Sequence, residues 1–434
     1  MSKDSTTFIS SGFPKHEKYK PSGVDWLGEV PEHWHLISLR NVLTEVSEKG
    51  FADLPLLSIT RELGIIERDV DDQEGNHNFI PPDLSGYKRI KEGNFGMNKM
   101  KAWQGSYGVS DFTGIVSPAY FVYSLNDALV PSFFHWAVRS KVYVGEMAKS
   151  SDGVRIGQWD LSKQGLKEIR LAVPINELEQ KAIVNFLDAK TKEIEETIKQ
   201  KQRTIELLEE YKHSLIEQAV TKGLDPSAPM KDSGVDWLGE VPEHWNRHRL
   251  KKFLSVSKTL VGRDWEKYDL LSLTLNGVIL RDMENPEGKF PSDFSTYQVV
   301  KPGQLILCLF DVEETPRTVG LSGHHGMITG AYDVFDLLNI HAQFFYYWYL
   351  SLDQHKNLRS LYRGLRNTIS MPRLQAMDIF LPDFGQQKDI VNFLDAKTKE
   401  IEEAKSSIQV QIDHLKEYKD SLIESAVTGK IKVA

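Results

Sequence analysis

Two parts of the sequence combine basic, aromatic and amide side chains within a short span, which is the mixture that suits contact with a nucleic acid. Residues 88–107 hold five lysines or arginines against one acidic residue, Glu92, with a tryptophan, a glutamine and a tyrosine among them. Residues 355–373 hold five basic residues and no acidic one, and further basic residues lie within 247–267. Basic groups bind phosphates, and guanidinium and amide groups can read base edges. A charge cluster alone is also typical of a solvated face, but its recurrence favours nucleic-acid binding.

Sequence motifs of catalysis are absent. No GxxxxGK[ST] phosphate loop occurs, nor the glycine-rich loop and Asp/Asn-Pro-Pro-aromatic tetrapeptide typical of amino-methyltransferases. Asp311, Glu313 and Glu314 form an acidic cluster, but no lysine follows at nuclease-like spacing, and we expect an exposed turn. The adjacent His324 and His325 are expected to contact solvent or an anion. We therefore expect no catalytic residue and no metal site in this chain.

Composition places the chain among soluble globular proteins. Its 434 residues are 40% hydrophobic and 26% charged, which predicts two or three domains with sizeable cores. The sequence shows neither a transmembrane stretch nor a signal peptide, so we expect a cytoplasmic protein without membrane contact. The net charge of −8 argues weakly against a surface that binds polyanions everywhere. The single cysteine, Cys308, lies in an apolar run and is predicted to be a buried structural thiol.

An internal repeat organises the chain. The block SGVDWLGEVPEHW at residues 22–34 recurs at 233–245, and the block IVNFLDAKTKEIEE at 183–196 recurs at 390–403. Between each pair of blocks lies a segment that differs strongly from its counterpart. The chain is thus built of two halves, each with a shared opening block, a variable module and a shared closing block.

The two variable modules share short motifs despite their divergence. LLSIT at residues 56–60 matches LLSLT at 270–274, and GIVSPAY at 114–120 matches GMITGAY at 326–332. These matches fall on strand-like runs and turn glycines, which predicts one fold with two different surfaces. We therefore expect the two modules to recognise two different ligands.

Each closing block predicts a helix of about 40 residues. Residues 180–221 contain no glycine or proline, and apolar residues recur there at spacings of three, four and seven. An apolar stripe that is narrow but this long must be covered by another long element, and the helix of the other closing block is the expected partner. We predict antiparallel pairing; the alternative is that each helix packs separately on its own module.

The order of these segments resembles the specificity subunit of type I restriction-modification systems, from residue 21 onward. The opening block and the starts of the long helices, QKAIVNFLDAKTKEIEE and QKDIVNFLDAKTKEIEE, carry the resemblance, and residues 98–120 resemble one recurrent class of target recognition domain. The resemblance implies an α+β fold in which two similar recognition domains are separated by two long helices forming an antiparallel coiled coil, with a pseudo-twofold internal repeat. The expected segments are an N-terminal arm (1–20), a first recognition module (21–175), a first spacer helix (176–225), a second module (226–382) and a second spacer helix (383–434).

The same resemblance implies a non-catalytic subunit. Each module would read one half of a bipartite, gapped target in double-stranded DNA, and the helices would dock two methyltransferase (modification) subunits and, through them, restriction and translocase subunits. This chain would bind no cofactor; S-adenosylmethionine, ATP and magnesium would be held by its partners. The alternatives are the recognition subunit of a type IIB system, a self-sufficient nuclease or methyltransferase, and a coiled-coil scaffold without nucleic acid.

Candidate DNA contacts follow from aligning the two modules and from base-edge chemistry. One loop of the first module, residues 99–107, corresponds to residues 311–318 of the second, and residues 151–158 correspond to 362–369. The candidates in the first module are Lys99, Lys101, Trp103, Gln104, Ser106, Tyr107, Arg155 and Gln158. Those in the second are Asp311, Glu313, Thr315, Arg317, Thr318, Arg363, Arg366 and Asn367.

Four tryptophans occur identically in both halves and cannot distinguish two half-sites. We expect Trp26, Trp34, Trp237 and Trp245 to serve packing or partner docking.

Overall fold

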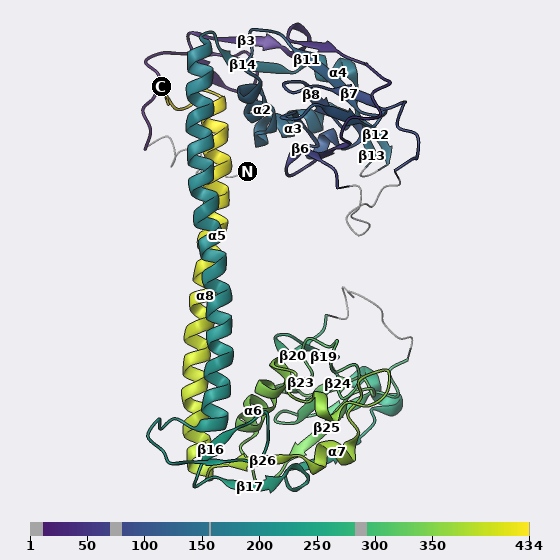
Figure 1. The fold of residues 1–434 in the computed structure, drawn as a ribbon, viewed down its shortest axis with the longest axis vertical. Coiled ribbons are helices and arrows are strands. Elements are labelled where there is room, and N and C mark those ends of the chain that lie inside the picture. The colour runs from purple at the N-terminus through teal and green to yellow at the C-terminus, as the bar shows by residue number, and fades with distance from the viewer. Residues whose placement is uncertain (1–11, 70–79, 156–157, 283–292, 434) are drawn as a thin grey trace. The chain divides into compact units, whose positions relative to one another are not determined.

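The computed structural model describes residues 12–69, 80–155, 158–282 and 293–433, which form two compact units (Figure 1). The first unit comprises Met1–Gln202 with Gln409–Ala434, and the second is Arg203–Ile408. Each of the two long helices, α5 (Glu177–Lys222) and α8 (Phe384–Val427), contributes residues to both units. In the part of the chain that the structure describes, no helix combines the length and apolarity needed to cross a membrane.

The first unit is a mixed α/β module built on antiparallel strand pairs. Its main sheet has the order β4-β11-β8-β9, and five two-stranded pairs surround it: β1–β2, β3–β14, β5–β6, β7–β10 and β12–β13. The strands are β1 (Tyr19–Pro21), β2 (Glu29–Pro31), β3 (Trp34–Ser38), β4 (Leu43–Glu45), β5 (Leu57–Thr60), β6 (Gly64–Glu67), β7 (Lys88–Ile90), β8 (Phe95–Met97), β9 (Tyr107–Val109), β10 (Gly114–Val116), β11 (Phe121–Leu125), β12 (Ser151–Arg155), β13 (Gln158–Leu161) and β14 (Arg170–Pro174). The helices are η1 (Leu39–Asn41), η2 (Lys99–Gln104), α2 (Pro131–Arg139), α3 (Lys141–Lys149) and α4 (Lys163–Glu168).

The second unit repeats this plan. Its main sheet has the order β18-β25-β22-β23, and the surrounding pairs are β15–β16, β17–β26, β19–β20 and β21–β24. The strands are β15 (Met230–Asp232), β16 (Glu240–Pro242), β17 (Asn246–Arg249), β18 (Leu254–Ser257), β19 (Leu271–Thr274), β20 (Gly277–Leu280), β21 (Gln298–Val300), β22 (Leu305–Leu307), β23 (Val319–Leu321), β24 (Gly326–Ile328), β25 (Asp333–Leu337) and β26 (Asp378–Leu381). The helices are η3 (Leu250–Lys252), η4 (Gly262–Lys267), α6 (Ala342–Gln354), η5 (Arg359–Leu361) and α7 (Met371–Ala376).

The shared sequence motifs occupy equivalent places in the two units, which confirms the prediction of one fold. LLSIT and LLSLT form β5 and β19, and the two GxxxxAY motifs begin with β10 and β24. A Cβ atom on Gly114 would lie 2.5 Å from the carbonyl oxygen of Pro55. A Cβ atom on Gly326 would collide in the same way with the carbonyl oxygen of Asp269. Only glycine allows this approach of two backbones, so both modules keep it.

Within each unit, one part of α5 packs against one part of α8, antiparallel as predicted. In the first unit, Ile183 and Leu187 share a buried core with Leu422 and Ala426. In the second, the core includes Ile216, Ala219, Ile390 and Leu394. The same cores contain the aromatic residues of each module, so the helices also pack on the modules. The alternative of separate helices without mutual contact is excluded.

Ion pairs between the two helices follow the same antiparallel register. Lys419 lies 3.2 Å from Glu195 in the first unit, and Lys212 lies 2.6 Å from Glu402 in the second. Lys405 also bonds Glu209. Apolar residues form the seam and charged residues flank it, as in a coiled coil.

The residues predicted to be structural are buried in a core or packed against one. Cys308 is 2% exposed, and its thiol donates to the carbonyl oxygen of Phe310 at 3.2 Å. Trp34 and Trp245 lie in the cores of their units, and Trp26 and Trp237 pack against those cores. All four repeated tryptophans thus take part in packing, and partner docking by the half-buried Trp26 and Trp237 stays a prediction.

Candidate nucleic-acid interface

In the first module, the fold brings the 99–104 segment onto the β12–β13 hairpin. The Trp103 ring packs edge-on against the Trp159 ring, with centroids 5.0 Å apart. The Lys99 ammonium lies 3.1 Å from a carboxylate oxygen of Asp160. Lys101 is exposed and Gln104 is half-buried. The two segments aligned by sequence thus form one surface, and Trp159 and Asp160 complete it.

Arg155 and Gln158 lie opposite each other in the register of β12 and β13. Their side chains are outside the described part of the structure. The backbone places both at the hairpin next to residues 156–157, which are also outside it. DNA contact by these two residues stays a prediction.

Two candidates of the first module belong to its core. Tyr107 is fully buried, and its hydroxyl donates to the carbonyl oxygen of Val138 at 3.1 Å. Ser106 is 2% exposed. Neither side chain reaches the surface, because Tyr107 begins the buried strand β9 and Ser106 directly precedes it, so neither is available for DNA contact.

In the second module, the fold also joins the two aligned segments. The Arg366 Nε–H donates to Asp311 Oδ1 at 3.0 Å, and a second guanidinium N–H bonds the other carboxylate oxygen. The Asn367 amide donates to Glu314 Oε1 at 2.9 Å. Arg359 similarly binds the Glu313 carboxylate through Nε, at 3.0 Å. Each acidic residue of the cluster therefore has a basic or amide partner within the module.

A half-buried lysine fixes the shape of the 311–318 loop. The Lys356 ammonium donates to the carbonyl oxygens of Val312 and Thr315 at 3.0 and 2.8 Å, and to Asp353 Oδ1 at 3.0 Å. Asp353 is 2% exposed and also accepts a hydrogen bond from the Thr318 backbone N–H. Satisfied buried polar groups of this kind order a loop.

The remaining candidates of the loop differ in accessibility. Thr318 is fully buried, so its side chain is not a DNA contact. Thr315 is half-buried. The Arg317 guanidinium donates to the Tyr346 hydroxyl at 3.2 Å and is also half-buried.

A tight turn of the second module presents exposed side chains. Arg363 and Thr368 exchange two backbone hydrogen bonds of 3.0 Å, and Gly364 has a φ of 71°. Arg363 is exposed, and Leu365 at the tip is fully exposed. Sequence reasoning missed Leu365, because nothing in the sequence distinguishes an exposed leucine from a core one.

Charge pairing dominates the electrostatics of this surface. The hydrogen bond and the charge of Arg366 hold the pKa of Asp311 below its usual range, and Arg359 does the same to the pKa of Glu313. Both carboxylates are thus ionised at neutral pH and can accept only. The Arg366 guanidinium also lies over the Phe310 ring, 4.9 Å from its centroid.

Several basic residues of the sequence clusters are engaged within their own modules. The Lys88 ammonium donates to the carbonyl oxygen of Tyr120 at 2.6 Å. Arg89 and Lys91 pair with Glu48 at 3.4 and 3.1 Å. Arg247 pairs with Asp378 at 2.5 Å. The clusters are therefore less positive than the local sequence suggests, since their acidic partners are distant in the sequence.

The arrangement can read hydrogen-bond patterns. In the second module it offers guanidinium donors from Arg363 and Arg366, acceptors from Asp311 and an amide from Asn367, on one ordered surface. The first module offers Lys101 and Gln104 beside the Trp103–Trp159 pair. Paired donors and acceptors held in fixed positions are what base-edge recognition requires.

Solved structures with the same architecture are known, although no protein-family model matches the chain. One is a chain from work on the structural basis of complex assembly and conformational transition of the type I R-M system. It is 14% identical, with a TM-score of 0.64 over 92% of this chain and 98% of that one. Another is the crystal structure of the HsdS subunit from Thermoanaerobacter tengcongensis, 14% identical, with a TM-score of 0.53 over 93% and 98% of the two chains. The chain therefore has the fold of the HsdS subunit of a type I restriction-modification system.

Proposed function

We propose that this chain is the DNA-recognition subunit of a type I restriction-modification complex. Each module reads one half of a bipartite, gapped target in double-stranded DNA. One observation carries the proposal: two modules with the same strand order present unlike side chains at equivalent surfaces. The likeness to HsdS over more than nine-tenths of the chain supports it.

The side chains at the two surfaces suggest which bases each module reads. Lys101 and Gln104 of the first module suit guanine and adenine, respectively. Arg366 and Arg363 suit guanine or phosphate, and Asp311 or Glu314 suits the cytosine amine. Different chemistry on a common framework predicts two unlike half-sites.

In this proposal the chain is not itself an enzyme. Two modification subunits would dock on the repeated segments and methylate adenine with S-adenosylmethionine, and restriction subunits would join through them. The charged flanks of α5 and α8 and the repeated opening blocks are the surfaces shared by both halves, so they suit two copies of one partner.

Methylome sequencing tests the proposal. The chain would be expressed with its modification subunits in a host without other adenine methyltransferases, and methylated adenines would be mapped. We expect a motif of two unlike half-sites separated by unread bases. A continuous or palindromic motif would contradict the proposal, as would methylation by this chain without its modification subunits.

A further inference from the structure

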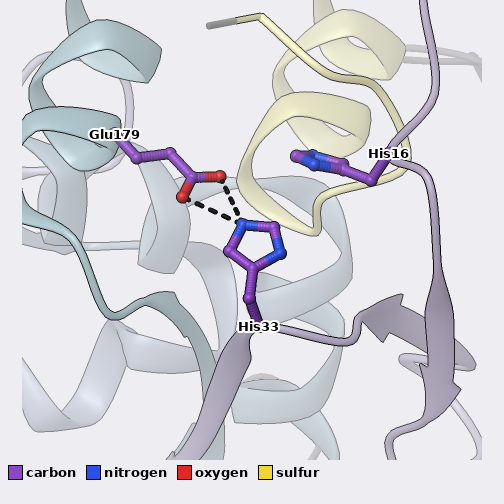
Figure 2. Close-up of side chains that lie close together, drawn as sticks. All are labelled: His16, His33 and Glu179. Carbon is purple, nitrogen blue, oxygen red and sulfur yellow. Dashed lines mark hydrogen bonds and ion pairs between the residues drawn. The ribbon is translucent and has the colours of Figure 1, made fainter.

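Three possible metal ligands converge in the first unit, away from the candidate nucleic-acid interface. They are His16, which precedes β1, His33, which lies between β2 and β3, and Glu179 in the first turn of α5. One ligand atom from each lies within 4.8 Å of the others. Figure 2 shows the two imidazole rings and the carboxylate meeting from three separate segments. Among the described residues, no other group of three His, Cys, Asp or Glu side chains gathers in this way.

The carboxylate is oriented by a buried neighbour. The Trp34 indole N–H donates to Glu179 Oε1 at 2.9 Å, and Trp34 lies wholly in the core. The Glu179 side chain is 15% exposed, and both its oxygens lie 3.0 to 3.1 Å from His33 Nε2. A hydrogen bond to one carboxylate oxygen is the usual way in which proteins orient a metal-binding carboxylate.

The arm that carries His16 is tied down on both sides. The His16 backbone N–H donates to the Tyr19 hydroxyl at 3.2 Å, and that hydroxyl donates to the carbonyl oxygen of Lys430 at 3.4 Å. The Lys432 backbone N–H donates to the carbonyl oxygen of Pro14 at 2.7 Å. The His16 ring then lies 5.3 Å from the His33 ring, centroid to centroid.

Two imidazoles and one carboxylate suit a particular class of ion. Zinc and related divalent transition ions take nitrogen and carboxylate ligands, whereas calcium and magnesium prefer oxygen alone. A tetrahedral ion with bonds of about 2.0–2.2 Å needs ligand atoms about 3.4 Å apart. The His33–Glu179 pair, at 3.0 to 3.1 Å, lies a few tenths of an ångström inside that spacing, and an ion between the two would replace their direct contact. The ligand atom of His16 lies within 4.8 Å of the other two, so its imidazole would turn towards them to complete the set and leave a fourth position for water.

The second half of the chain provides an internal comparison. By the offset of the repeated opening block, His33 corresponds to His244 and His16 to Ser227, and by the start of the long helices Glu179 corresponds to Gln386. The His244 Nε2 lies 3.1 Å from Gln386 Oε1, so the local geometry is retained. A hydroxyl and a neutral amide are poor zinc ligands. The metal-binding combination is therefore specific to the first half.

We propose that His16, His33 and Glu179 bind one divalent ion of the zinc class. The ion would tie the N-terminal arm to the start of α5 and to the repeated opening block. The pocket around these residues is lined by Lys18 and Lys432 and also by Glu17 and Glu32, so the neighbouring positive and negative charges offset each other. The proposal does not depend on DNA recognition.

Zinc titration of the full-length chain tests the proposed metal site. The protein would be freed of any histidine tag, treated with a chelator and titrated by calorimetry, with Co²⁺ absorption as a second readout of ligand geometry. We expect one ion per chain and a rise in melting temperature on addition of zinc, since an ion that binds only the folded state stabilises it.

Matched variants locate the site. Glu179→Gln installs the residue of the second half and retains an acceptor for Trp34, so folding should be preserved. It and His16→Ala should each weaken zinc binding at least about tenfold, whereas His244→Ala should have no effect. Absence of zinc binding, unchanged binding in both first-half variants, or an equal loss in His244→Ala would overturn the proposal. Circular dichroism confirms that each variant is folded.

Discussion

Arg366 and Asp311 hold each other through both side chain and backbone. The guanidinium donates to both carboxylate oxygens, with Nε 3.0 Å from Oδ1, and the Asp311 backbone N–H donates to the carbonyl oxygen of Arg366 at 2.7 Å. The pair joins two segments that are 55 residues apart. Two of the five guanidinium donors are used, and the others can still face a base or a phosphate.

Replacing Arg366 by alanine should weaken binding to the matched target by about 1–3 kcal/mol and relax only the half-site read by the second module. The physical reason is the loss of bidentate donors at one position. Binding competition would be measured with the assembled complex on duplexes varied in one half-site at a time. Arg247→Ala is the matched control, because it removes another exposed arginine paired with an aspartate, Asp378. A uniform loss on all sequences would make Arg366 a phosphate contact, and no loss at all would remove it from the interface.

Asp311→Asn should have a different effect. The substitution keeps the backbone hydrogen bond but removes the charge that neutralises Arg366, so the arginine becomes available to phosphates. We expect tighter binding to non-target DNA, a salt dependence steeper by about one counterion, and less discrimination between sequences. Unchanged salt dependence together with unchanged discrimination would show that the pair does not act on DNA. Fluorescence anisotropy at several salt concentrations measures both quantities.

His135 should make the first unit sensitive to acid. Burial, and secondarily the charge of Arg139, lower the pKa of His135 to about 4, and its Nδ1 accepts the Val109 backbone N–H at 3.2 Å. The unfolded chain therefore takes up this proton near pH 6.5 and the folded chain only near pH 4. The contribution to stability is complete above pH 6.5 and falls as the pH drops to 4, by up to about 3 kcal/mol.

Thermal unfolding between pH 7.5 and 4 measures this effect. His135→Asn supplies a similarly placed acceptor that does not titrate, so its stability should fall less over the same range. Parallel curves for the two proteins would show that His135 does not cause the loss.

Glu209 should stabilise the helix pair of the second unit, and this contribution should be lost on acidification in a lower pH range than that of His135. Burial opposes its ionisation, but hydrogen bonds from Lys212 and Lys405 outweigh this and lower the pKa of Glu209 to about 2. Its contribution is therefore complete above about pH 4.5 and is lost as the pH falls towards 2. Because the side chain is 34% exposed, solvent screening reduces the effect, and we expect Glu209→Gln to cost about 1 kcal/mol at pH 7.

Urea unfolding at pH 7 and at pH 3 measures the difference, which should shrink at the lower pH. Glu206→Gln is the control, since Glu206 pairs with Arg203 on its own helix. An equal cost for the two substitutions would show that the contact between helices adds nothing.

Much of the fold could be predicted because it is encoded locally. The repeat defines two copies, and the spacing of apolar residues defines the long helices and their seam. Gly114 and Gly326 mark the same backbone crossing in both modules, so a short sequence match was enough to predict a common fold.

The candidate interface was less predictable, for two physical reasons. First, alignment identifies a loop but not which way each side chain points: Tyr107 and Thr318 look like contacts in the sequence but lie in the core. Second, the acidic partners of basic residues are distant in the sequence, as Glu48 is from Arg89. The sequence of a basic run therefore does not show which of its charges are neutralised by ion pairs. The same reason conceals the His16, His33 and Glu179 cluster, in which His33 and Glu179 are 146 residues apart.

The division of the long helices has a consequence for the order in which the protein folds during synthesis. The second unit is continuous, Arg203–Ile408, so all of its residues emerge from the ribosome in one stretch. The first unit needs Leu422, Ala426 and Ile431, which join its core but are translated after the whole of the second unit. The module that is synthesised first is thus completed last. Until then, Ile183 and Leu187 lack the residues of α8 against which they pack. A released chain that ends at residue 408 would contain every residue of the second unit but lack the C-terminal residues of the first core.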